Sequence, residues 1–178
     1  MSKKKLATVW LGGCSGCHMS LLDIDERLLE LLKLVDIVKS PIVDTKEFPG
    51  VDVALVEGAI TSDEHLHEIH NIRKKTKILV AFGDCAVTAN VPSLRNPIPM
   101  KDVLSRAYIE AESVDKGQIP CDDAILKLLP RVMPLHEAVK VDVFIPGCPP
   151  SADLIFYVLS ELVNGRIPVL DKERLRYG

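Results

Sequence analysis

A chain of 178 residues is long enough for one well-buried domain, and we expect a single domain over residues 1–178. Hydrophobic residues make up 47% of it and aromatic residues only 4%, which predicts an aliphatic core. The formal net charge of -3 argues against a nucleic-acid partner, because such partners select a basic surface. The basic start precedes an apolar run too short for a membrane span or a signal peptide, which predicts a cytoplasmic location.

Strands and helices alternate along the predicted chain. Buried strands are predicted from five apolar runs, at residues 6–11, 35–38, 51–56, 77–82 and 141–145. Helices are predicted from helical spacing and end signals at residues 21–32, from residue 63 to near residue 75, at 100–107 and at 152–163. This alternation predicts an α/β fold in which a doubly wound parallel sheet carries helices on both faces.

Three details of this pattern can be checked against a structure. The second strand resumes at residues 42–43 after a break at Pro41. Either Thr61 or Ser62 caps the polar helix that follows. Residues 87–123 carry several prolines and a weak pattern, so we expect a surface excursion there that serves as a docking surface.

Four of the five cysteines follow predicted strands. Cys14 and Cys17 come after the first strand, Cys85 after residues 77–82, and Cys148 after the last strand. The carboxyl ends of parallel strands lie along one edge of a sheet, so these loops can converge there. In a cytosolic protein a disulfide framework is disfavoured, and four converging thiolates suit an iron–sulfur cluster.

Glycines accompany each of these cysteines. Gly13 and Gly16 flank the first cysteine pair, so the main chain can bend around a cofactor and offer its amides to the cofactor's sulfurs. Gly83 and Gly147 directly precede the other two loops. Together these residues predict a cofactor cradle, of which Gly13, Gly16 and Gly147 are candidate cofactor-binding residues.

Other kinds of site are also compatible with these residues. The Cys14–Cys17 pair alone could be a thioredoxin-like redox pair, and the cysteines together could hold a structural zinc ion. A flavodoxin-like turn could bind flavin phosphate through Ser15 and Ser20, which would make the chain a flavin-binding electron carrier. Cys121 follows no strand, and we interpret it as a buried or incidental thiol.

With these residues in hand, the chain resembles the small subunit of a nickel–iron hydrogenase of the soluble, NAD-reducing (bidirectional) type. The matching motifs are GCSGCHMS at 13–20, VEGAI at 56–60, FGDCA at 82–86 and PGCPP at 146–150. The resemblance implies a flavodoxin-like domain and a proximal 4Fe–4S cluster ligated by Cys14, Cys17, Cys85 and Cys148. It also implies a large partner subunit that holds the nickel–iron centre where hydrogen is split.

Two departures from the longer, membrane-associated members bear on the electron path. Gly13 stands where those members usually have a glutamate, and the chain ends about where their C-terminal cluster domain would begin. We therefore expect electrons to leave to another polypeptide, which the resemblance implies is an iron–sulfur and flavin diaphorase module carrying FMN and reducing NAD. The related cluster-bearing subunit of complex I is the alternative, but its motif has adjacent cysteines.

Four more residues near these motifs carry expectations. The resemblance places Glu57 near the cluster, where it would bind or tune the cofactor, or only cap the next element. For His18 we expect a hydrogen bond at a helix start rather than metal binding, and Asp84 is interpreted as a turn residue. Trp10 is expected in the core or at a subunit interface.

Overall fold

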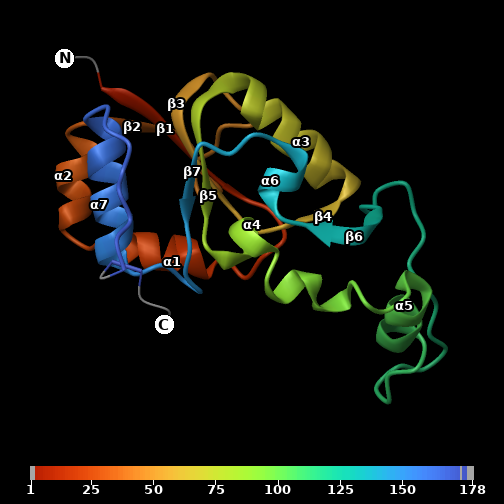
Figure 1. Cartoon of the computed structure of the whole chain (residues 1–178). Helices are drawn as coiled ribbons and strands as arrows, with labels where there is room; N and C mark the ends of the chain where they lie inside the picture. The colour runs from red at the N-terminus through yellow and green to blue at the C-terminus, as the bar shows by residue number, and fades with distance from the viewer. Residues whose placement is uncertain (1–2, 173, 176–178) are drawn as a thin grey trace.

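A five-stranded parallel sheet forms the centre of the computed structural model, which describes residues 3–172 and 174–175 (Figure 1). Its spatial order is β2-β1-β3-β5-β7, and all four neighbouring pairs are parallel. The strands are β1 (Lys4–Trp10), β2 (Val35–Lys39), β3 (Val51–Glu57), β5 (Thr76–Phe82) and β7 (Val143–Ile145). Counted along the chain this is the 2-1-3-4-5 order of flavodoxin-like sheets, so the predicted fold class is confirmed.

Helices cover both faces of this sheet (Figure 1). One face packs against α1 (Gly16–Leu22), α2 (Arg27–Leu32) and α7 (Ala152–Val163). The other packs against α3 (Asp63–Lys75), α4 (Asp84–Thr88) and α6 (Leu135–Ala138). Side chains alternate along β3, with Val53 and Leu55 in the first core and Ala54 and Val56 in the second.

Both long helices begin at a capping serine. The Ser62 hydroxyl accepts a hydrogen bond from the His65 N–H at the start of α3, so Ser62 rather than Thr61 is the N-cap. The Ser151 hydroxyl accepts from the Leu154 N–H at the start of α7. Even these helices have only 13 and 12 residues, and within the described part of the chain no helix is long and apolar enough to cross a bilayer.

The first helical region differs from its prediction as one helix over 21–32. It forms two helices, because the chain turns after Leu22 and Asp25 takes a left-handed conformation with φ 55°. Aspartate tolerates that conformation better than most residues do. The prediction of strand at residues 42–43 is also wrong: the Val43 N–H donates to the Ser40 carbonyl in a turn.

Several smaller elements carry no strong sequence pattern. β4 (Ile60–Ser62) and β6 (Leu128–Met133) pair antiparallel as a separate two-stranded sheet, and η1 (Val91–Arg95) is a 3-10 helix. Between them α5 (Met100–Tyr108) confirms the predicted helix and extends away from the central sheet in Figure 1. No described residue from 91 to 131 is buried, which confirms the surface excursion except at its predicted start, where Ala89 is buried. The role of the excursion in docking stays a prediction.

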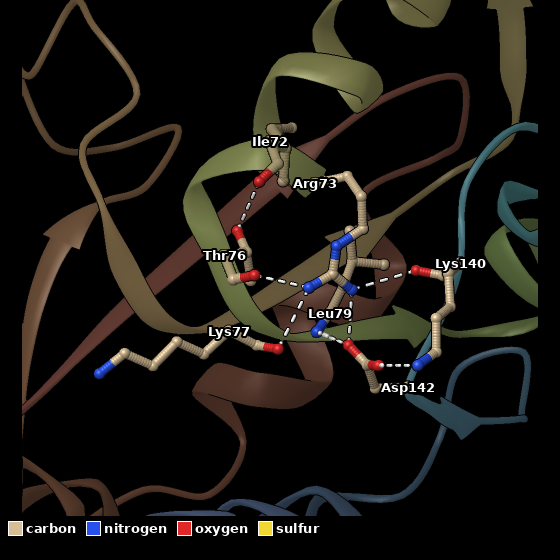
Figure 2. Close-up of polar contacts among 7 residues, drawn as sticks. All are labelled: Ile72, Arg73, Thr76, Lys77, Leu79, Lys140 and Asp142. Carbon is tan, nitrogen blue, oxygen red and sulfur yellow. Dashed lines mark hydrogen bonds and ion pairs between the residues drawn. The ribbon is translucent and has the colours of Figure 1, made fainter.

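A network of polar contacts around Arg73 and Asp142 joins elements at the amino end of the sheet (Figure 2). The Arg73 guanidinium at the end of α3 donates to Asp142 Oδ2 and to the carbonyl oxygens of Thr76, Lys77 and Lys140. Asp142 Oδ2 also accepts from the Leu79 N–H of β5 at 2.8 Å. These bonds tie α3 to β5 and to the segment that leads into β7, at the end of the strands opposite the cysteines.

Candidate metal centre

The loops that carry the four predicted ligand cysteines lie at the carboxyl ends of the strands. Cys14 follows β1, Cys17 lies in the first turn of α1, Cys85 lies in α4 after β5, and Cys148 follows β7. Backbone bonds join the last two loops, because the Gly83 N–H donates to the Ile145 carbonyl at 2.8 Å.

Asp84 strengthens this junction. Its N–H donates to the Gly147 carbonyl at 2.9 Å, and its Oδ1 accepts from the Gly147 N–H at 2.7 Å. Asp84 was predicted as a turn residue, but it is the first residue of α4. These two bonds link the Cys85 loop to the Cys148 loop.

The thiols lie within electrostatic reach of one another. Burial raises the pKa of the Cys17 thiol, and negative charge on Glu57, Cys85, Cys14 or Cys148 raises that pKa further. Burial also raises the pKa of the Cys85 thiol, and Cys148, Cys14 and Glu57 add to the increase. Thiols placed this closely cannot all be deprotonated unless a positive charge compensates them. A bound metal supplies that charge.

A single zinc ion needs closely grouped ligands. Two sulfurs on one zinc ion lie about 4 Å apart, since each bond is about 2.3 Å long. Among residues 3–172 and 174–175, no three His, Cys, Asp or Glu side chains are placed so that they could hold one metal ion. The side chains as they lie therefore give the zinc alternative no support.

Gly83 makes room for the buried thiol. Its φ of +83° lies in the left-handed region, and a Cβ built on it would lie 2.1 Å from Cys17 Sγ. Only glycine fits there, so the turn after β5 can pack directly against the Cys17 sulfur. Gly83 was not among the candidate cofactor-binding residues, although its place in the FGDC motif was a usable signal.

The three predicted glycines have different neighbours. A Cβ on Gly16 would lie 3.2 Å from Cys14 Sγ, so Gly16 lies beside a candidate ligand. A Cβ on Gly13 would lie 3.3 Å from Gly58 Cα, and one on Gly147 would lie 2.5 Å from Pro150 Cα. These two glycines allow close backbone packing, and contact of any of the three with a cofactor stays a prediction.

Glu57 lies at the end of β3 and caps α1 from outside that helix. Its side chain is only 3% exposed; Oε1 accepts from the Cys17 N–H at 3.4 Å and Oε2 from the His18 N–H at 3.0 Å. Those two N–H groups normally bond to an N-cap side chain, but Ser15 at that position makes no such bond. Glu57 thus takes over the capping role for the helix that carries Cys17.

His18 completes this arrangement. Its Nδ1 lies 2.5 Å from Glu57 Oε2, and its ring lies edge-on to Trp10 and to Phe82, with centroids 5.2 and 5.9 Å away. The expected hydrogen bond at a helix start is confirmed. His18 Nε2 is buried and has no hydrogen-bond partner among the described residues. Trp10 is 42% exposed, so it is not a core residue, and its place at an interface stays a prediction.

The remaining alternatives find less support in the geometry. The Ser20 hydroxyl donates to the Pro150 carbonyl at 2.5 Å and is therefore engaged, which disfavours a flavin-phosphate role. A thioredoxin-like pair relies on free N–H groups at a helix start, but Glu57 accepts from those of α1. Cys121 is exposed on the excursion, so the buried alternative is wrong for it.

Comparison with known proteins identifies the family that shares these features. Residues 14–162 match the family described as "NADH ubiquinone oxidoreductase, 20 Kd subunit". The delta subunit of the NAD-reducing hydrogenase HoxS from Cupriavidus necator is 43% identical over 168 residues, which cover 92% of this chain and 80% of that protein. The F420-non-reducing hydrogenase vhu of Methanocaldococcus jannaschii has a subunit that is also 43% identical, but the match covers only 58% of the length of that subunit.

A solved structure agrees with this match over the whole fold. A chain of an NAD+-reducing NiFe hydrogenase in the H2-reduced state superposes with a TM-score of 0.96 at 38% identity, covering 99% of this chain and 100% of that one. The family description alone would also fit the complex I alternative. These relatives, however, are hydrogenase subunits, which favours the first interpretation of the cysteine motif.

Proposed function

This chain belongs to the family of the 20 Kd subunit of NADH ubiquinone oxidoreductase and, within it, to the small subunits of NAD-reducing nickel–iron hydrogenases, and from this premise we propose that it relays electrons out of a hydrogen-splitting partner. It is a subunit of an oxidoreductase rather than a complete enzyme. The observation that carries the proposal is the convergence of three segments, which together carry four cysteines, at one edge of the sheet.

The residues at that edge fit a 4Fe–4S cluster. Cys14, Cys17, Cys85 and Cys148 would supply its four thiolate ligands, the usual donor set for such clusters. The direct packing of Gly83 against Cys17 Sγ brings the turn before Cys85 to the Cys17 thiol and supports this fit, as does the effect of Cys85, Cys14 and Cys148 on the Cys17 pKa. When bound, a cluster supplies one-electron redox chemistry whose potential depends on burial, charge and hydrogen bonds to sulfur.

This chain's own residues would hold and surround that centre. Cys17 lies buried against the sheet, whereas Cys14 and Cys148 are exposed, so one side of the site faces the interior and the other faces the surface. An exposed side of this kind suits electron exchange with a partner. We propose that the exposed side faces the large subunit with the nickel–iron centre, and that a diaphorase module with FMN accepts the electrons and reduces NAD. A cytoplasmic location stays part of this proposal.

Replacing one ligand tests the assignment. Cys85→Ser in the intact complex should remove the cluster, because the serine hydroxyl is a poor substitute for an iron-bound thiolate. The expected result is loss of iron and acid-labile sulfide and of the electron paramagnetic resonance signal of the reduced cluster, with hydrogen oxidation uncoupled from NAD reduction. Cys121→Ser, on the excursion, is the matched control and should retain all of these.

The same measurements separate the alternatives. Unchanged iron content and an unchanged spectrum in Cys85→Ser would contradict the ligand assignment. Flavin without iron or sulfide in the isolated wild-type chain would favour the flavin-binding carrier, and a colourless chain containing zinc would favour the structural zinc domain.

A further inference from the structure

We propose that Glu57 is a positioning residue that fixes the Cys14–Cys17 loop for cluster binding and, through its charge, sets the potential of the bound cluster. The inference rests on the proposed function. It concerns a carboxylate that is not itself a candidate ligand but lies against the segment that carries two of them.

The contacts of Glu57 reach both ends of that segment. A Cβ on Gly13, just before Cys14, would lie 3.8 Å from Glu57 Oε1, and the same oxygen accepts from the Cys17 N–H at 3.4 Å. The main chain of Glu57 adds a third anchor, because its carbonyl accepts from the Leu11 N–H at 2.8 Å. One residue at the end of β3 thus contacts the loop before its first cysteine and at its second.

The site requires two acceptor oxygens. Oε1 accepts from Cys17, and Oε2 accepts from the His18 N–H and lies 2.5 Å from His18 Nδ1. A glutamine would turn an NH2 group toward one of these N–H donors, and an aspartate is one methylene shorter. Since Glu57 is 2% exposed, water cannot replace a lost acceptor, and the donor that loses its partner would stay buried and unpaired.

Glu57 acts on the cysteine segment through its charge, in addition to its hydrogen bonds. The Glu57 carboxylate lies directly beside the Cys17 segment, because Oε1 accepts from the Cys17 N–H at 3.4 Å. A fixed negative charge beside a redox centre opposes the arrival of an electron. Removing that charge should therefore raise the midpoint potential of the cluster, an effect that a purely structural cap would not have.

The experiment uses the intact complex with Glu57→Gln and Glu57→Asp. Asp142→Asn is the matched control, because Asp142 also accepts from a backbone N–H and from a nitrogen side chain but lies at the opposite end of the strands. Iron release to a chelator and the midpoint potential of the cluster, from a redox titration followed by electron paramagnetic resonance, are measured for each. Loss of a residue that orients metal ligands typically weakens metal affinity 10–100-fold, so we expect roughly tenfold faster iron release or more in Glu57→Gln.

The pattern across the variants decides the question. Glu57→Gln should also shift the midpoint potential upward, whereas Glu57→Asp should release iron faster but keep the wild-type potential. Asp142→Asn should match wild type in both measurements although it lowers thermal stability. Wild-type iron release and an unshifted potential in Glu57→Gln would overturn the inference, whereas a wild-type chain that carries no iron and sulfide of its own would instead refute the proposed function.

A second pair of variants covers the case in which Glu57→Gln does not assemble. His18→Phe keeps a ring between Trp10 and Phe82 but removes the side-chain donor to Glu57, and His18→Asn restores a donor near the position of Nδ1. We expect faster iron release in His18→Phe and recovery in His18→Asn. Equal, wild-type release from both would overturn the inference.

Discussion

Gly83 illustrates how a single residue determines the position of a candidate ligand. The turn after β5 approaches Cys17 so closely that a Cβ at this position would lie 2.1 Å from Sγ, nearer than any non-bonded contact allows. The same residue has a positive φ of 83°. Backbone strain and steric clash therefore both oppose any other side chain, and only the clash acts on the cysteine.

Alanine substitution separates these two effects. An alanine held in the left-handed conformation costs about 1–3 kcal/mol of backbone strain. Gly83→Ala should lower the free energy of unfolding by more than this, because Cys17 must also move. Gly165→Ala is the matched control: its φ is +75°, but nothing lies within 4 Å of the new Cβ. Denaturant unfolding and iron analysis measure both effects. If both variants lost the same stability and bound the same iron, the contact with Cys17 would have no consequence.

At the scale of elements, the end of α3 is held by charge in addition to the apolar packing of Ile72. Partial burial opposes ionisation of Asp142, but the Leu79 N–H and the Arg73 guanidinium outweigh it and lower the pKa of that carboxyl. The Arg73 and Asp142 side chains are each 22% exposed and 2.5 Å apart (Figure 2). The bridge therefore stabilises the fold only while Asp142 is ionised.

The pH dependence of stability tests these contacts of Asp142. Because the folded-state pKa of Asp142 is lowered, its contribution is fully present above the unfolded pKa near 3.8 and is lost as the pH falls through the folded value. At pH 7, Asp142→Asn should reduce the free energy of unfolding by about 1.5–3 kcal/mol, the range for hydrogen bonds to charged groups. Urea titrations should show this difference shrinking toward pH 3.

A surface pair serves as the control for that measurement. Glu161 and Arg166 form a surface ion pair, and the hydrogen bond from Arg166 lowers the pKa of Glu161. Glu161→Gln should cost less stability at pH 7 than Asp142→Asn, because the Arg166 side chain is 59% exposed, against 22% for Arg73, and water screens its charge. A difference between wild type and Asp142→Asn that stays constant with pH would contradict the role given to the carboxylate.

Prediction from sequence succeeded where one element's own pattern decides its structure. The apolar runs predicted the five parallel strands, and the choice of Thr61 or Ser62 as cap predicted where α3 begins. It failed where partners distant in the chain decide, as for β4 and β6, whose pairing joins segments on either side of the excursion. The split between α1 and α2 depends on one left-handed residue, Asp25, which leaves the apolar spacing unchanged.

The candidate site divides in the same way. Its four cysteines could be named because strand ends meet at one edge of a parallel sheet. The capping of α1 by Glu57 could not be derived, since it joins residues 39 and 40 positions apart in the chain. Nor does the sequence reveal which glycine faces a sulfur, because that depends on how the turn after β5 packs on α1.

At the scale of the whole molecule, the chain consists of a densely buried sheet and a thinly anchored excursion. In β3, residues Ala54, Leu55 and Val56 are each 0% exposed. The excursion is held at its base, where the Asn96 side chain exchanges two hydrogen bonds with the Val132 backbone at 3.0 and 2.8 Å. Segments with few buried contacts open at low free energy, so stability should differ sharply between these two parts.

Limited proteolysis tests this contrast in the isolated chain. A protease present at low concentration should cut first within residues 97–127, where no residue is buried, and leave the sheet and its flanking helices intact. Asn96→Ala removes both side-chain bonds to Val132, so it should speed that first cut without exposing sites in α3 or α7. Mass spectrometry of the fragments locates the cuts. A first cut within α3 or α7, or no acceleration in Asn96→Ala, would show that contacts other than the Asn96–Val132 hydrogen bonds anchor the excursion.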